Sequence, residues 1–154
     1  PWFDHTVFVF VADHNAGSAG KQDLPIENYR IPLFVYSPAN IPADEVSTVA
    51  SQIDLAPTLL GLLQFDYTSS FFGRDLLSGL SLPGRAVIGN YQHLGLYDGE
   101  HLFILSPRQG VRDVAPEEGR TVRASLDEPG IRRAVAYYQG ASTLFRQRKL
   151  GPVG

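Results

Sequence analysis

The run from Thr6 to Ala12, TVFVFVA, constrains the fold more than any other segment of the chain. Its β-branched and aromatic residues favour a strand, and they do not alternate with polar residues. A strand that is apolar on both sides needs cover on both faces, as in a parallel sheet flanked by helices. The run therefore predicts an α/β fold with parallel strands, in which this segment is buried.

Two further segments fit such a layer. Ile31 to Ser37, IPLFVYS, predicts a second buried strand, and Ile53 to Leu63 has the apolar spacing of a helix. Asp54 suits the N-cap of that helix. Two such strands and one helix cannot enclose a sheet that is apolar on both faces. We therefore expect the rest of the sheet to come from a partner or from a missing N-terminal part of the same protein, and we expect the chain alone to form homo-oligomers.

The second half of the chain has the pattern of an antiparallel meander. Arg85 to Asn90 predicts a short strand. Leu94 to Tyr97 and His101 to Leu105 flank Asp98-Gly99, which is typical of a type I′ hairpin. The stretch from Arg108 to Asp127 is polar and rich in turn residues, and it predicts a loop.

A C-terminal helix follows the meander. Its buried face is predicted from apolar residues at helical spacing, which are Ile131, Ala134, Val135, Tyr138, Ala141 and Phe145. The chain then divides into three parts: an α/β part over residues 1–80, the meander and loop over residues 81–127, and the C-terminal helix over residues 128–150.

Composition excludes several classes of function. The chain has no cysteine, so a metal ion must be held by histidine, carboxylate or backbone oxygen. A net charge of -3, without a Lys/Arg cluster before the last few residues, argues against nucleic-acid binding. No apolar run approaches the ~20 residues that cross a bilayer, so we expect this chain itself to be soluble.

Asp13 and His14 follow the first predicted strand directly. In open α/β sheets, ligands bind beyond the carboxyl ends of the strands. A carboxylate beside an imidazole suits Mn²⁺ or Zn²⁺ better than Ca²⁺, which prefers oxygen ligands alone. Two ligands do not complete a site, and an isolated pair has an alternative interpretation in which Asp13 caps a turn and His14 is a polar loop residue.

Four segments occur in the order and spacing of the C-terminal signature of the sulfatase family: VFVFVADHN, YRIPLFVYSPA, ASQIDLAPTLLGLL and FFGRDLL. The chain thus resembles the C-terminal part of a sulfatase-family enzyme of the alkaline phosphatase superfamily. It looks most like the branch of phosphoglycerol transferases and lipoteichoic acid synthases. The resemblance implies the C-terminal portion of an alkaline-phosphatase-like sandwich, with Asp13 and His14 as metal ligands. It also implies that the Thr, Ser or formylglycine nucleophile lies upstream, so this chain carries no catalytic nucleophile.

The activity that the resemblance implies for the intact protein is hydrolysis or transfer of a phosphate or sulfate ester with a divalent metal ion. Mn²⁺ is the expected ion, with Ca²⁺ and Zn²⁺ as alternatives, and Lys21 is a candidate contact for a substrate oxygen unless it is a solvated loop residue. Phosphoglycerol transfer is the expected reaction. The alternatives are a sulfatase and a non-catalytic binding module with a vestigial site. The resemblance further implies a membrane anchor upstream and a catalytic domain on the periplasmic or extracellular side.

Five other residues that are able to carry chemistry are assigned structural roles. Asp54 is explained by helix capping, and Thr58 has no neighbouring base in the sequence. His5 precedes the first strand at its amino end, away from a site at the carboxyl end. His93 and His101 flank the predicted hairpin, where packing or surface histidines are common.

Overall fold

The computed structural model describes residues 2–15 and 23–151 of the chain. It divides into two compact units, Pro1–Ser47 and Thr48–Gly154, which are treated separately below. Residues 48–80 thus belong to the same unit as the meander and the C-terminal helix. Among the described residues, no helix has both the length and the apolar character needed to span a membrane.

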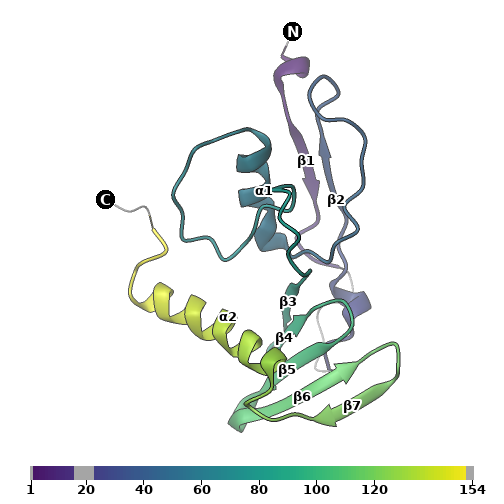
Figure 1. Cartoon of the computed structure of the whole chain (residues 1–154), viewed down its shortest axis with the longest axis vertical. Helices are drawn as coiled ribbons and strands as arrows, with labels where there is room; N and C mark the ends of the chain where they lie inside the picture. Colours follow the sequence, from purple (N-terminus) through teal and green to yellow (C-terminus); the bar gives the residue numbers. More distant parts are fainter. Residues whose placement is uncertain (1, 16–22, 152–154) are drawn as a thin grey trace. The chain divides into compact units, whose positions relative to one another are not determined.

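The first unit is built on a two-stranded ribbon, β1 (Phe8–Val11) and β2 (Leu33–Tyr36), with the short 3-10 helices η1 (Phe3–His5) and η2 (Ile26–Tyr29) beside it in the chain (Figure 1). The strands are antiparallel, with Phe8 opposite Tyr36 and Val11 opposite Leu33. The prediction of parallel strands is therefore wrong for this pair. A run without alternation indicates that both faces are apolar, but it does not set the direction of the neighbouring strand.

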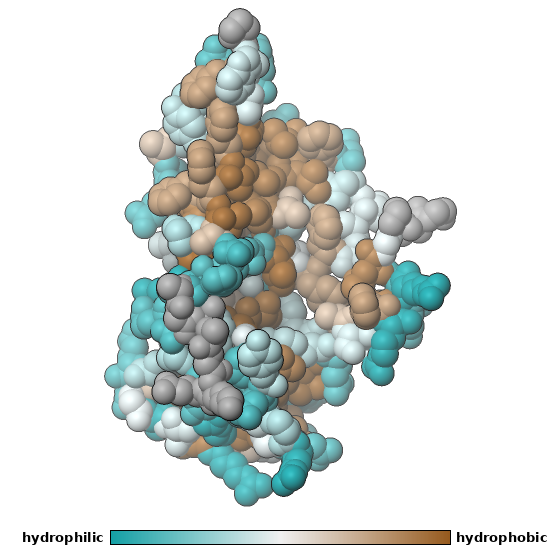
Figure 2. All heavy atoms as spheres, turned by 180° about the vertical axis from the view of Figure 1, so that it is seen from behind, coloured by the Kyte–Doolittle hydropathy of each residue, from teal (hydrophilic) through white to brown (hydrophobic). Residues whose placement is uncertain are grey.

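Large apolar side chains of the ribbon remain exposed to solvent. Phe10 is 58% exposed and Phe34 is 65% exposed. Figure 2 shows hydrophobic residues over the upper part of the view, where Figure 1 places β1 and β2. At the other end of the ribbon, Trp2, Phe3, Phe8 and Tyr36 form a cluster of tilted and edge-on rings. The expectation that the chain does not cover both faces of these strands by itself is confirmed.

The second unit contains a five-stranded antiparallel sheet in the order β3-β4-β5-β6-β7 (Figure 1). The strands are β3 (Ala86–Gly89), β4 (Leu94–Tyr97), β5 (Leu102–Ser106), β6 (Gly110–Ala115) and β7 (Arg120–Arg123). The predicted meander is confirmed, and it extends into the segment that predicted a loop. In the β4–β5 turn only Gly99 has a positive φ, at 110°, so the turn is not the predicted type I′, which needs two such residues.

Helix α2 (Pro129–Arg146) packs on one face of this sheet and confirms the predicted C-terminal helix. Ile131 and Ala134 are fully buried in a core with Leu96, Phe103 and Val111. Phe145 was predicted on the buried face, but it is 72% exposed. The helix contacts β4 and β5, and in its middle the Tyr138 hydroxyl donates to the Gly95 carbonyl oxygen of β4 at 3.0 Å, whereas Phe145 lies in the last turn (Figure 1). Helical spacing alone does not show how far the sheet reaches.

Helix α1 (Leu55–Leu62) follows the short 3-10 helix η3 (Gln52–Asp54). The N-cap of this combined element is Ser51, four residues before the start of α1 proper. Asp54 closes a capping box, in which its carboxylate accepts a hydrogen bond from the Ser51 backbone N–H at 2.9 Å. The sequence therefore located the helix correctly, and the Asp54 side chain acts at position N3 of the box, while it makes no side-chain cap bond as the residue that precedes α1.

Candidate functional site

Asp13 and His14 lie just beyond the end of β1 and are largely exposed. The exposed fraction of the side chain is 89% for Asp13 and 66% for His14. The His14 backbone N–H donates to Asp13 Oδ1 at 2.9 Å, and His14 Nε2 lies 3.6 Å from Asp13 Oδ2. Consecutive residues of a strand point to opposite faces, so it is the departure from strand geometry after Val11 that brings these two side chains together.

The His14 ring is oriented by its other nitrogen. Nδ1 lies 3.0 Å from the Asn15 carbonyl oxygen. Because a carbonyl oxygen only accepts hydrogen bonds, Nδ1 carries the proton, and Nε2 of the neutral imidazole keeps its lone pair. A backbone carbonyl on the second ring nitrogen is the arrangement that commonly orients a metal-bound histidine.

The donor atoms of this pair fit a divalent metal ion. His14 Nε2 and Asp13 Oδ2 lie 3.6 Å apart, and two acceptor atoms at such a separation would be stabilised by a cation held between them. Two ligands of a tetrahedral ion, each about 2.1 Å from it, lie about 3.4 Å apart. A small movement of either side chain reaches this separation.

The turn that carries the pair is held by Asn15. Its Nδ2 atom donates to the Arg30 carbonyl oxygen at 3.1 Å and to the Glu27 carbonyl oxygen at 3.4 Å. These bonds tie the end of β1 to η2 and to the residue that follows it. Asn15 therefore positions the neighbouring His14 by two routes, through the ring contact on its own carbonyl and through its side chain.

The described residues bring no third histidine or carboxylate into a metal-binding group with this pair. No group of three or more His, Asp or Glu side chains within residues 2–15 and 23–151 is arranged to hold a metal ion. Lys21, the candidate substrate contact, lies outside the described residues. Asp13 and His14 thus stand as a pair.

Asp54 occupies a different environment, in the second unit. It is fully buried, and Arg85 donates to its two carboxylate oxygens from Nη1 at 2.6 Å and from Nη2 at 2.7 Å. The backbone N–H groups of Ser51 and Arg74 donate to the same carboxylate at 2.9 and 2.7 Å. Burial by itself raises the pKa of Asp54, but the Arg85 guanidinium and the two backbone donors together hold that pKa below its usual value.

Arg85 extends this network to helix α2. Its Nε atom donates to the Tyr137 hydroxyl at 2.8 Å, and its guanidinium carbon lies 5.4 Å from the centre of the Tyr137 ring. Thr58 has a structural role. Its hydroxyl donates to the Asp54 carbonyl oxygen at 2.6 Å and accepts a hydrogen bond from the Leu76 N–H at 3.1 Å. Helix capping by Asp54 is confirmed in the form of the capping box, and the Thr58 hydroxyl is engaged in structural hydrogen bonds. Sequence reasoning missed Arg85, since no local pattern links it to Asp54.

The remaining histidines also have structural surroundings. His5 lies in η1 at the amino end of β1, and His93 Nδ1 is 2.9 Å from the Ser106 hydroxyl. His101 Nδ1 is 2.8 Å from Asp113 Oδ1, and its ring stacks on Phe103 at 5.8 Å between centroids. The hydrogen bond to Asp113 raises the pKa of His101, an effect that partial burial opposes.

Comparison with known proteins identifies the fold. Residues 3–65, which are less than half of the chain, match the sulfatase family, and this segment contains both Asp13 and His14. A solved structure of a protein in the alkaline phosphatase superfamily from Vibrio parahaemolyticus superposes on 99% of the chain with a TM-score of 0.86 and 28% sequence identity. The chain has an alkaline phosphatase superfamily fold. The α/β class, the antiparallel sheet and the C-terminal helix all agree with that superfamily.

The chain corresponds to only a part of the matched superfamily protein. The chain spans 38% of the length of the Vibrio parahaemolyticus protein. In the Vibrio parahaemolyticus protein, the segment that corresponds to β1 and β2 is part of a longer chain. In the present chain, apolar side chains of β1 and β2 are exposed. The reaction, the substrate and the partners of the whole protein are therefore matters for proposal.

Proposed function

We propose that this chain is the C-terminal part of a metal-dependent enzyme that hydrolyses or transfers phosphate or sulfate esters. The observation that carries the proposal is the separation of 3.6 Å between His14 Nε2 and Asp13 Oδ2, directly after a strand of the segment that matches the sulfatase family. Open parallel α/β sheets bind ligands beyond the carboxyl ends of their strands, and the pair lies beyond the carboxyl end of β1, whose described neighbour β2 is antiparallel.

Asp13 and His14 hold a divalent ion in this proposal. Bound there, the ion neutralises charge on the transferred phosphate or sulfate group and activates a nucleophile. A nitrogen and an oxygen ligand favour Mn²⁺, then Zn²⁺, over Ca²⁺. Lys21 is proposed to contact a substrate oxygen as a point charge. The nucleophile and the other metal ligands come from an N-terminal part of a longer protein.

The same N-terminal part is the proposed partner of the exposed ribbon. Phe10, Phe34 and Tyr36 present apolar surface that further strands and helices of a larger sheet would cover. The length of the matched Vibrio parahaemolyticus protein supports this, because the chain spans 38% of it. When the chain is alone, a second copy is the proposed substitute, and the result is a homo-oligomer.

Phosphoglycerol transfer is the reaction that we propose for the intact protein, because an imidazole in the metal pair favours Mn²⁺ over Ca²⁺. This proposal includes membrane anchoring outside the present chain and a catalytic domain on the periplasmic or extracellular side. Sulfate ester hydrolysis is the second candidate, and the match of residues 3–65 to the sulfatase family favours it. A non-catalytic module with a vestigial metal pair is the remaining alternative.

The test uses the longer protein that contains this chain together with its N-terminal part. We expect Mn²⁺-dependent release of glycerol phosphate from phosphatidylglycerol vesicles, and a loss of more than about 100-fold in His14→Ala and in Asp13→Ala. Asp44→Ala is the matched control, because Asp44 is an exposed carboxylate of the same unit outside the pair. Turnover of p-nitrophenyl sulfate in place of lipid favours the sulfatase. Undiminished activity in both variants refutes the metal pair, and absence of any turnover favours the non-catalytic module.

A further inference from the structure

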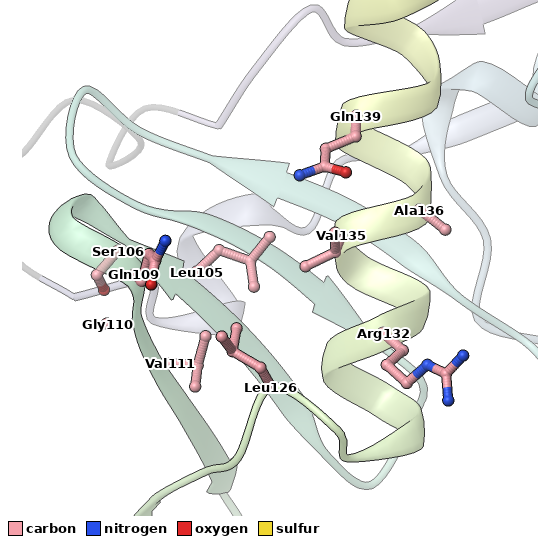
Figure 3. A pocket seen from close by; sticks show the side chains of 10 residues that line it. All are labelled: Leu105, Ser106, Gln109, Gly110, Val111, Leu126, Arg132, Val135, Ala136 and Gln139. Atoms are coloured by element: carbon pink, nitrogen blue, oxygen red, sulfur yellow. The ribbon is translucent and has the colours of Figure 1, made fainter.

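A groove in the second unit runs between helix α2 and the β5–β6 hairpin (Figure 3). Its volume is about 560 Å³, which lies within the range of small-molecule sites. The floor is apolar and consists of Leu105, Val111, Leu126 and Val135. None of the lining residues belongs to the unit that carries Asp13 and His14, so the groove does not depend on the function proposed above.

The groove continues along the helix. A second cavity of about 260 Å³ shares Leu105, Val135 and Gln139 with the first and extends to Ser142 and Arg146. The distance along the helix axis from residue 132 to residue 146 is about 21 Å. The shape thus suits an elongated ligand better than a compact one.

The rim of the groove carries neutral hydrogen-bonding groups. Gln139 extends from α2 over the groove, and Ser106 and Gln109 lie on the opposite side, at the end of the hairpin (Figure 3). Arg132 is the charged residue that lines the larger cavity, and Figure 3 shows its guanidinium directed away from Val111 and Leu126. A carboxamide both donates and accepts hydrogen bonds, so the rim matches an uncharged polar group.

The hairpin holds one side of this rim in an unusual backbone conformation. Arg108 and Gln109 have φ values of 58° and 59°, in the left-handed region that favours glycine. Backbone strain of this kind is concentrated at ligand sites, where the surrounding structure maintains it. Ser106 and Gly110 pair with each other across the tight turn between β5 and β6. This turn places Gln109 at the rim.

We propose that this groove binds a small neutral amphiphile. Its apolar body lies on Leu105, Val111 and Val135, and its single amide, arylamine or hydroxyl group bonds to the carboxamide of Gln139 or, in the opposite orientation, to that of Gln109. Neutrality follows from the larger cavity, where Arg132 is the one charged lining residue and is directed away from the floor, so that nothing there compensates an ionic ligand that leaves water. Arg146 lies at the far end of the smaller cavity, where its Nε donates to the Ser142 carbonyl oxygen at 3.3 Å. The apolar floor supplies affinity, and the carboxamides supply orientation.

N-phenyl-1-naphthylamine is a suitable probe, because it is neutral, apolar and has one N–H donor. We expect the 154-residue chain to bind one equivalent with a dissociation constant in the micromolar range, measured by probe fluorescence. In ¹⁵N-labelled chain the amide shifts should concentrate at Leu105, Val111, Val135 and Gln139. Gln139→Trp fills the groove and should weaken binding at least tenfold. Gln139→Ala removes the carboxamide and should weaken it roughly fivefold.

Gln147→Trp is the matched control, because Gln147 follows the same helix and lines neither cavity. It should bind the probe like the unmodified chain. Equal affinities of the Gln139→Trp and Gln147→Trp variants overturn the proposal, as do amide shifts confined to β1 and β2. If Gln139→Trp abolishes self-association in sedimentation experiments, the groove is an interface between copies and the proposal fails. Gln139 is exposed, and the Gln139→Ala variant carries the test if the tryptophan variant does not fold.

Discussion

Arg85 and Asp54 form a bidentate, fully buried ion pair at 2.6 and 2.7 Å, although 31 positions separate them in the chain. The pair joins the start of α1 to the residue before β3, and through Tyr137 it reaches α2. Two backbone N–H groups satisfy the remaining capacity of the Asp54 carboxylate. This pair therefore connects the helical and the β parts of the second unit.

Replacing Asp54 should destabilise the chain strongly. Asp54→Asn leaves the Arg85 charge buried without its counter-ion, and we expect the free energy of unfolding to fall by about 3–5 kcal/mol. Urea denaturation followed by circular dichroism measures this change. Asp44→Asn removes an exposed carboxylate and should change the free energy by less than about 0.5 kcal/mol. Similar effects of the two substitutions would contradict the role of the pair.

The free energy of unfolding at acid pH should depend on the same ion pair between Asp54 and Arg85. The pKa of Asp54 is lower in the folded chain than in the unfolded chain, where it is about 3.9. Its contribution to stability is therefore present above about pH 3.9, and it is lost as pH falls through the folded pKa. The difference in unfolding free energy between the unmodified chain and Asp54→Asn should narrow in acid. A difference that stays constant down to the acid transition would argue against this assignment.

The contribution of His101 to stability should change with pH in the opposite direction to that of Asp54. Its pKa is raised by the Asp113 carboxylate on β6, with Asp98 in the β4–β5 turn adding to the effect and Arg120 on β7 opposing it. The stabilisation is present below the unfolded pKa of about 6.5, and it is lost as pH rises through the folded pKa. The stability difference between the unmodified chain and His101→Gln should therefore shrink from about pH 6.5 upward. Asp113→Asn should remove this pH dependence, and its persistence in that variant would point to another group.

The isolated chain should bind Mn²⁺ weakly. Asp13 and His14 supply two ligands and leave the other coordination positions to water, so we expect a dissociation constant no tighter than the millimolar range. Mn²⁺ should broaden the NMR signals near His14 selectively, and His14→Ala should abolish that effect while Asp44→Ala preserves it. A submicromolar dissociation constant by calorimetry would mean that additional ligands lie within this chain.

The isolated chain should also lack esterase activity. A metal pair without a nucleophile forms no covalent intermediate with a phosphate or sulfate ester. Pure chain with Mn²⁺ should release p-nitrophenol from p-nitrophenyl phosphate or p-nitrophenyl sulfate no faster than Mn²⁺ alone. Turnover above that background, lost in His14→Ala, would place the whole active site within these residues.

Local patterns predicted the elements whose structure depends on near neighbours. Two strand-like segments on either side of Asp98-Gly99 identified β4 and β5, and helical spacing identified α2. The change from an apolar run to Asp13-His14 marked the end of β1, and the structure places the two side chains 3.6 Å apart. Their assignment as metal ligands stays a prediction.

Only the tertiary structure decided the relationships that join distant parts of the chain. No local periodicity shows the direction of β2 against β1 or the pairing of β6 with β7. The same holds for the ion pair between Asp54 and Arg85. Strand direction and register depend on which backbone groups meet, and a polar edge strand such as β7 resembles a loop because its side chains remain in water. By itself the sequence determined which residues are apolar and at what spacing. The folded chain decided what covers them, since burial depends on contacts between segments and not on the order of residues within one.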